Sequence, residues 1–413
     1  MDRNLDDLFV YPKHLLDEES LSVVKLVRQL SDREIVTKRM EYREGYENLF
    51  AQKRKKLCID IGLQKLTIPA DFGGFGWNSP SKAPAMLALA LETGRADASI
   101  GVLSVVPWVL FLMITRQREN NEKLCSTLAS LYSEEAVRTP SLILTGPGLK
   151  GMQSPLFLGR SILARAEQSE TGLTLNGKDL RPLIAGGMAD LFCVVCADRN
   201  GKPGIAFVPG DAKGIKRGPS ILMTGLNACG NSQIDFNSVP LPMGNVLDQE
   251  GNLEEMYTWI SLLLGGVSVG AAMNFFELLA DWSESRTIKG GVMLKENPLC
   301  ASVLADVAED IALARLLLCD LAGMVAAQKE SAPETIRRTF TYAGMIGHRV
   351  QKGVMYAMNR GLELMGSAGY AKEWHVEKHW RDVKTIQSIL YGVAAEVPIK
   401  MDTARFFYNC TEI

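Results

Sequence analysis

Hydrophobic residues recur at helical spacing in the first 130 residues of the chain and again after residue 247. Near the start, apolar side chains repeat every three residues behind an acidic stretch at positions 17–19, which is typical of the beginning of an amphipathic helix. Near the end, a similar stripe is formed by Leu304, Val307, Ile311, Ala314, Leu318 and Leu321. Long helices with short connections predict a helical bundle in the last region.

The middle region, from about residue 141 to residue 247, has a different pattern. Short runs that alternate or are continuously apolar, such as SLILT and LFCVVCAD, are separated by Gly, Pro, Asn and Asp. Most intervals are too short for a crossover helix, which predicts antiparallel strands in a barrel or a sandwich. Helices, then strands, then helices predict an α+β fold.

Two uncharged runs, 98–115 and 256–276, approach the length of about 20 residues that crosses a bilayer. The first run contains Pro107 and two serines, and the second contains three glycines between Glu255 and Glu277, with no Lys or Arg cluster nearby. These features favour helices buried in a large core. A membrane span is the alternative.

Composition narrows the class of protein. The chain has 413 residues, of which 47% are hydrophobic and 22% charged, as in a packed globular protein. Forty-five Lys and Arg residues against 47 Asp and Glu give a net charge of −2, so nucleic acid is not an expected partner. The acidic N-terminus lacks the basic start and apolar run of a signal peptide, which predicts a cytoplasmic location.

Cysteine and histidine pairs could suggest a redox or metal site. Cys193 and Cys196 form a C-x-x-C motif, but it lies in an expected strand, where side chains three apart point to opposite faces. His375 and His379 would share one helix face, yet no third ligand accompanies them. We therefore expect no metal site. A redox or metal role for the cysteine pair, and a metal role for the histidine pair, are the alternatives.

The segment TGPGLKG contains Gly146, Gly148 and Gly151 in the spacing G-x-G-x-x-G. In a dinucleotide-binding fold, a helix and then a parallel strand follow these glycines, but MQSPLFLGRS shows no amphipathic helix. The alternative interpretation is a loop whose backbone amides face a ligand.

Several segments, in this order, resemble the acyl-CoA dehydrogenase family from about Asp17 to Tyr408. LQKLTIPADFGGFGW is similar to the family's GGxG loop, LTGPG to the start of its TEPGAGSD motif, and LNGKDLRPLIAGGMADLFCVVCA to its central strands. GNSQIDFNSVPLPMGNVL, SRTIKG, ELMGSAGY and WRDVKTIQSILYG match later signatures of the family.

The resemblance implies three domains: an α-helical one (1–135), an antiparallel β-barrel (136–247) and a C-terminal four-helix bundle (248–413). It also implies FAD between the last two domains, with its adenosine end reaching a neighbouring subunit. The implied reaction is α,β-dehydrogenation of an acyl-CoA, with electrons passed to an electron-transfer flavoprotein. A homotetramer, or a hetero-oligomer with a homologous subunit, is the expected assembly.

The same resemblance gives candidate cofactor residues. Thr145 stands where the family has a flavin-contacting Thr, and Gly148 belongs to the same motif. Arg286 matches the Arg that pairs with FAD phosphate across the interface, a role suited to a planar guanidinium. Gly366 and Gly369 match glycines under the adenosine. The pair Arg381 and Asp382 matches the family's Arg-Asp pair.

The catalytic base of the family has no counterpart. Gly392 occupies the position of the usual Glu, and the alternative base position falls at Ile260. A glycine cannot accept a proton, so the base is unknown, and Asp97 and Glu396 are the nearest candidates. Each is more simply explained as a structural or surface carboxylate.

Other positions also depart from the family. Pro182 and Ile184 replace an aromatic residue and a Thr that stack on flavin. The remaining replacements are Gly146, Gly151, Met152 and Glu363.

Three hypotheses follow. The first is an acyl-CoA dehydrogenase with a relocated base. The second is a non-catalytic subunit that completes the site of a homologous chain. The third is a flavin monooxygenase on the same fold, which needs no α-proton base.

Overall fold

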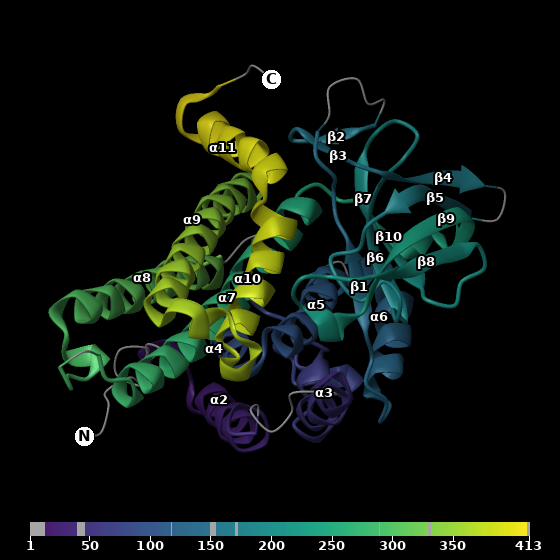
Figure 1. Cartoon of the computed structure of the whole chain (residues 1–413). Coiled ribbons are helices and arrows are strands. Elements are labelled where there is room, and N and C mark those ends of the chain that lie inside the picture. Colours follow the sequence, from purple (N-terminus) through teal and green to yellow (C-terminus); the bar gives the residue numbers. More distant parts are fainter. Residues whose placement is uncertain are drawn as a thin grey trace.

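The computed structural model describes residues 13–38, 46–116, 118–148, 154–169, 172–288, 290–328 and 332–410. Helices come first, a sheet follows, and helices end the chain, which confirms the α+β class. The sheet lies on one side and the C-terminal helices on the other, with the N-terminal helices below both (Figure 1).

Helices form the N-terminal region. Asp17 begins the first of them, because its Oδ1 accepts a hydrogen bond of 2.7 Å from the backbone N–H of Ser20. The helices are α2 (Glu18–Ser31), α3 (Tyr46–Lys55), α4 (Ala83–Ala96), α5 (Ala98–Arg116) and α6 (Arg118–Ser133).

The sheet follows as a series of mostly short strands. Its strand order is β10-β7-β6-β4-β5-β9-β8, and β1 pairs with β6. The strands are β1 (Pro140–Ile143), β4 (Ala164–Ser169), β5 (Gly172–Leu180), β6 (Leu191–Ala197), β7 (Pro203–Pro209), β8 (Ile215–Ile221), β9 (Asn231–Leu241) and β10 (Val246–Leu247), with β2 (Leu156–Phe157) and β3 (Arg160–Ser161) as a separate hairpin.

Strand direction corrects one expectation. Most pairs are antiparallel as predicted, but β1 and β4 both run parallel to β6. The short intervals exclude a crossover only between neighbours in sequence, whereas β1 and β4 reach β6 after other strands have intervened.

The α-helices of the C-terminal region, in the part of it that the structure describes, are α7 (Asn252–Ser285), α8 (Pro298–Ala326), α9 (Pro333–Met365), α10 (Val376–Tyr391) and α11 (Val393–Tyr408). Helices α7 to α10 pack on one another as the expected bundle, and α11 is an additional helix against α9 and α10. The change from strand to helix falls between Leu247 and Asn252, but the limits of independent domains stay a prediction.

The two apolar runs are core helices. An ideal Cβ on Gly270 of α7 would lie 2.0 Å from the carbonyl oxygen of Leu91 in α4, so glycine lets the two backbones touch. α5 and α7 are long and apolar enough to cross a membrane, yet 94% and 89% of their most apolar windows are buried inside the protein. Their hydrophobic side chains are thus used within the fold.

The cysteine pair lies as its strand predicts. Cys193 belongs to the core beneath the helices and Cys196 to the core on the other face of the sheet. Both thiols are free, and burial raises the pKa of each. Within the described ranges no three His, Cys, Asp or Glu side chains converge as a metal site would require.

Candidate functional site

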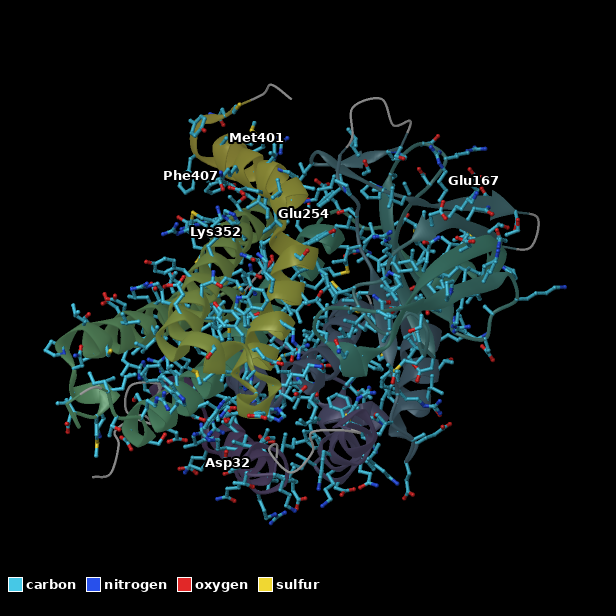
Figure 2. All side chains as sticks on the ribbon, viewed as in Figure 1. Asp32, Glu167, Glu254, Lys352, Met401 and Phe407 are labelled. Carbon is cyan, nitrogen blue, oxygen red and sulfur yellow. The ribbon has the colours of Figure 1, made fainter. Side chains whose placement is uncertain are left out.

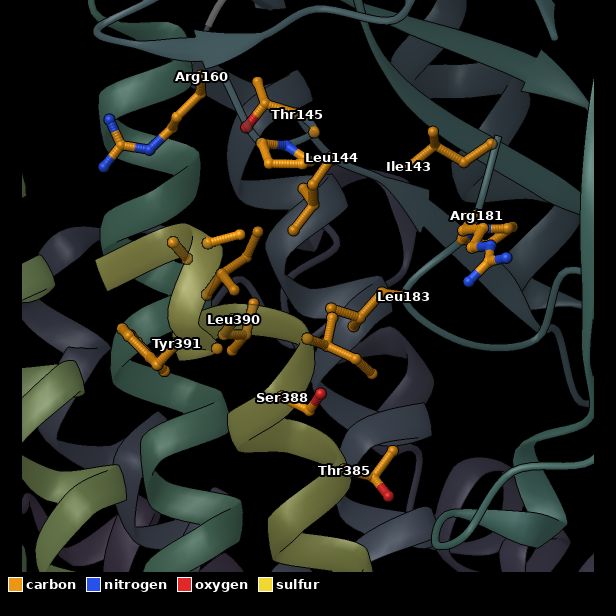
Figure 3. Close-up of a pocket in the computed structure, with 18 of the residues that line it drawn as sticks. Ile143, Leu144, Thr145, Arg160, Arg181, Leu183, Thr385, Ser388, Leu390 and Tyr391 are labelled. Atoms are coloured by element: carbon orange, nitrogen blue, oxygen red, sulfur yellow. The ribbon is translucent and has the colours of Figure 1, made fainter. Parts of the chain in front are cut away.

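A cavity of about 970 Å³ lies between the sheet and the C-terminal helices. Its walls come from the loop after β1, the hairpin strand β3, the segment after β5, helices α7 and α9, and the turn that joins α10 to α11. Thr145 lies above that turn, and Leu390, Tyr391 and Ser388 lie on α10 below it (Figure 3). This volume is typical of a site for a cofactor or a small ligand.

Thr145 is held by a tyrosine of α7. The hydroxyl oxygens of Thr145 and Tyr257 are 2.6 Å apart, and the backbone N–H of Thr145 donates to the same tyrosine oxygen at 3.1 Å. Burial raises the pKa of Tyr257, while these hydrogen bonds and the charge of Arg160 oppose the rise. Sequence reasoning identified Thr145 but missed Tyr257, because only the fold brings residues 112 positions apart together.

Both positions that hold a base in the family line this cavity, and neither is acidic. Gly392 connects α10 to α11, and Ile260 lies on α7. An ideal Cβ on Gly392 would lie 2.6 Å from the carbonyl oxygen of Ser388, so this turn is built around a glycine. Among the described lining residues the one carboxylate is Asp179, which is exposed and accepts a hydrogen bond from Gln233.

Asp97 does not face the cavity. Its Oδ1 accepts hydrogen bonds from the backbone N–H groups of Ser99 and Ile100 at the start of α5, and its Oδ2 pairs with Lys378 at 2.7 Å. Lys378 also pairs with Asp382 at 2.6 Å. Asp97 therefore caps a helix and joins it to α10, which contradicts the suggestion that it is a relocated base.

Glu396 points away from the cavity as well. Its carboxylate pairs with Lys400 at 2.6 Å and with Lys352 at 3.1 Å, and these bonds lower its pKa to about 2. Lys352 lies among the C-terminal helices, away from the sheet (Figure 2). A carboxylate that is so acidic and so placed is a poor base for a cavity substrate.

Arg160 and Asp402 form a buried ion pair at the edge of the site. Nη2 of Arg160 lies 2.6 Å from Oδ2 of Asp402, and both side chains are at least 90% buried. The guanidinium carbon also lies 6.0 Å from the ring centre of Tyr257 and 5.6 Å from that of Phe340. The ion pair connects the β2–β3 hairpin to α11. No sequence motif predicted this contact.

Of the two residues at the flavin-stacking positions, only Pro182 lines the cavity. Pro182 lines the cavity, whereas Ile184 is fully buried and its carbonyl accepts a hydrogen bond from Ser141. The wall beside Pro182 is extended by Leu183, which is also a lining residue. An apolar surface thus remains where the family places an aromatic side chain.

The glycines of the loop after β1 are explained by close packing. A Cβ on Gly148 would lie 2.0 Å from the carbonyl oxygen of Gly159, and Gly146 lines the cavity and pairs with Ser161. Gly151 and Met152 lie outside the described residues. A ligand role for Gly148 stays a prediction.

The other predicted cofactor residues are not among those that line the cavity. Arg286 is exposed at the end of α7, and Gly366 ends α9 with a φ of 60°. Gly369 packs so closely that a Cβ would lie 2.7 Å from the carbonyl oxygen of Leu362, and Glu363 pairs with Arg360. Their assignment to FAD stays a prediction.

Arg381 and Asp382 form hydrogen bonds with a loop of the middle region. Arg381 donates to the carbonyl of Thr224 at 2.7 Å, and Asp382 accepts from the backbone N–H of Leu226 at 2.7 Å. Thr224 lines the cavity. The pair therefore positions one wall of the site.

Comparisons with known proteins agree with this geometry. A model described as the acyl-CoA dehydrogenase C-terminal domain matches residues 262–390. Cyclohex-1-ene-1-carbonyl-CoA dehydrogenase of Syntrophus aciditrophicus is 23% identical, over 90% of this chain and 86% of its own. The caffeyl-CoA reductase-Etf complex subunit CarC of Acetobacterium woodii is 25% identical, over 89% and 93% respectively.

Solved structures give the same fold. A glutaryl-CoA dehydrogenase from Mycobacterium smegmatis, in complex with FADH2, superposes with a TM-score of 0.76 over the whole of both chains, at 18% identity. Residues 262–390 match the acyl-CoA dehydrogenase C-terminal domain, and the nearly full-length relatives and the solved structures agree that the whole chain is similar to acyl-CoA dehydrogenases and has their fold.

Proposed function

We propose that this chain is a FAD-dependent oxidoreductase of an acyl-CoA thioester. The observation that carries the proposal is the single cavity lined both by Thr145, at the family's flavin-contacting position, and by Gly392 and Ile260, at its two base positions. One cavity can thus bring a cofactor and a thioester together.

The lining suits a flavin ring in shape and chemistry. Leu144, Pro182 and Leu183 offer apolar surface to a flat ring, and Thr145 offers a hydroxyl and a backbone N–H at its edge. Arg286, exposed outside the cavity, remains available to the phosphates of a cofactor that extends toward a second subunit. A bound flavin would accept two electrons from the substrate.

The chain's own residues supply binding and exclusion of water. The ion pair of Arg160 and Asp402 closes the hairpin against α11, and the Arg381–Asp382 pair fixes the opposite wall. Val393 is 89% exposed and lines the cavity, so the entrance lies beside it. Charge that develops on a thioester oxygen would meet a hydroxyl donor such as that of Ser261.

Branched or cyclic acyl groups are the first substrates to try, since one relative is named for a cyclohexene carbonyl thioester. An electron-transfer flavoprotein is the proposed acceptor, because another relative is named as part of an Etf complex. Purified protein should carry FAD and should lose its yellow colour when titrated anaerobically with its acyl-CoA. Yellow protein that no acyl-CoA bleaches would contradict dehydrogenation.

A non-catalytic subunit is the second candidate. It is favoured by the cavity wall, where Asp179, exposed at the rim, is the one carboxylate among the described lining residues. Co-purification with a homologous chain that carries the base would support it, and activity of the isolated chain would eliminate it. Oxygen-dependent hydroxylation of a ligand would instead identify a monooxygenase, which also needs no carboxylate.

A further inference from the structure

The proposed reaction lacks a proton acceptor. Gly392 and Ile260 cannot accept one, Asp97 caps a helix, and Glu396 faces two lysines outside the cavity. Besides the exposed Asp179 and the basic side chains of Arg160, Arg181 and Lys384, the ionisable groups among the described lining residues are the phenols of Tyr257 and Tyr391.

We propose that Tyr257 is the residue that exchanges a proton with the α-carbon of the substrate. The inference rests on the proposed function, because it assigns the base of that same reaction. Tyr257 precedes Ile260 by three residues on α7, so it lies on the same helix face one turn earlier, and both residues line the cavity.

The hydrogen bonds of Tyr257 suit a base. The backbone N–H of Thr145 can only donate, so the tyrosine oxygen accepts it, and the Thr145 hydroxyl can supply a second donor. Two donors to one oxygen favour its deprotonated form, although burial is the larger effect and leaves the pKa of Tyr257 raised. A serine or threonine hydroxyl alone would be a far weaker acid–base group.

A cation lies over the ring of Tyr257. The guanidinium carbon of Arg160 is 6.0 Å from the ring centre, while Phe157 and Phe340, which also contact the ring, carry no charge. The Arg160 charge is partly matched by Asp402 at 2.6 Å. Arg160 and Thr145 together oppose the effect of burial on the pKa of Tyr257.

The step balances as follows. The proton on the α-carbon moves to the deprotonated oxygen of Tyr257, and the electron pair of that bond stays on the substrate. The β-hydrogen would leave with its own electron pair, which a bound, oxidised FAD would accept in the proposed function. A double bond forms between the two carbons, and Tyr257 later releases its proton.

Tyr391 is the competing phenol. Its hydroxyl lies so close to α9 that a Cβ on Gly347 would be 2.0 Å from it. Burial raises the pKa of Tyr391 to about 12, with the Ser261 hydroxyl offsetting only part of the rise. No backbone N–H donates to it among the described residues, so it is the poorer base.

The test is α-proton exchange in heavy water. The probes are (butylthio)acetyl-CoA and (cyclohexylthio)acetyl-CoA, in which sulfur replaces the β-carbon so that no hydride can leave. Mass spectrometry follows deuterium at the α-carbon with flavin-loaded wild type, Tyr257→Phe, Tyr391→Phe and Tyr342→Phe, the last a control whose ring packs against Phe406 of α11 and does not line the cavity. Bound flavin and thermal unfolding show that each variant is folded.

We expect Tyr257→Phe to slow exchange about 100-fold or more, with flavin content unchanged, while Tyr342→Phe exchanges like the wild type. Equal exchange by Tyr257→Phe and wild type, loss of exchange in Tyr391→Phe instead, or no exchange by flavin-loaded wild type would each overturn the proposal. Those results would leave flavin binding intact, whereas protein that takes up no flavin contradicts the proposed function itself.

A second readout needs no cofactor. Ultraviolet titration of flavin-free protein, taken as the difference between wild type and Tyr257→Phe, reports ionisation of this phenol. Thr145→Val should raise its pKa, because the hydroxyl donor is lost while the backbone N–H donor stays. An unchanged pKa would contradict the role given to Thr145.

Discussion

Nη2 of Arg160 lies 2.6 Å from Oδ2 of Asp402, in a buried ion pair between residues 242 positions apart. Burial raises the pKa of Asp402, and the charges of Arg160 and Arg405 oppose that rise. Because Arg160 also lines the cavity, the pair joins the stability of the hairpin to the shape of the site.

Replacing Arg160 by Met should therefore destabilise the protein by about 3 kcal/mol, since it leaves a buried carboxylate with one partner fewer. Urea unfolding measures the change. Arg160→Met combined with Asp402→Leu should recover much of the loss, and a double variant no more stable than the single one would contradict a specific pair.

Glu396→Gln should leave α-proton exchange and flavin content unchanged, because this carboxylate pairs with Lys352 and Lys400 outside the cavity. The deuterium assay with (butylthio)acetyl-CoA measures the rate. A large fall in that rate would restore Glu396 as a candidate base.

Gly392→Ala should destabilise the chain by about 1–3 kcal/mol, because the new Cβ would meet the carbonyl of Ser388 at 2.6 Å. Gly353→Ala in α9 is the control, because a Cβ there meets nothing within 4 Å. For the same reason Gly392→Glu should not simply install a base. Thermal unfolding measures the stability of both alanine variants. Equal stability of the two would show that the turn accommodates the added Cβ, which would contradict the prediction.

Thr145→Val should weaken FAD binding about tenfold, since one hydrogen-bonding group at the cavity edge is lost. Fluorescence titration of flavin-free protein measures the dissociation constant. The comparison with Tyr257→Phe shows whether the hydroxyl acts on the flavin or through its tyrosine partner; an unchanged constant in Thr145→Val would remove this residue from the cofactor site.

Asp17 gives a prediction about pH. Its pKa is lowered from 3.8 to about 2, first by Lys82 and then by Ser20. A lowered pKa contributes stability above the ordinary value that is lost as pH falls toward the lowered one. Asp17→Ala should therefore cost about 1 kcal/mol at neutral pH through loss of the cap, and less below pH 3.8. Unfolding of both proteins across this range checks the sign, and a difference that grows in acid would contradict it.

The periodic parts of the sequence predicted the helices, the strands and the buried character of α5 and α7 because their apolar positions repeat along one segment. The parallel pairing of β1 with β6 was not predictable in this way, since it depends on which distant strands meet. The same limit applies to the site. Gly392 and Ile260 were recognised by position, whereas the contact between Thr145 and Tyr257 requires the folded chain.

Asp97 shows why a residue type alone misleads. It was a candidate base because Gly392 and Ile260 cannot accept a proton, but its two oxygens are used by the start of α5 and by Lys378. Buried carboxylates with such partners hold elements together more often than they react.

The most direct test of the account is the visible absorption spectrum and FAD content of the purified chain, before and after reconstitution with FAD. We expect the two absorption bands of bound flavin, about one FAD per chain, and loss of this binding in Ser388→Trp, which places a large ring on the cavity wall. A colourless chain that takes up no FAD on reconstitution, alone or with a homologous subunit, would contradict the claim that this cavity holds a flavin.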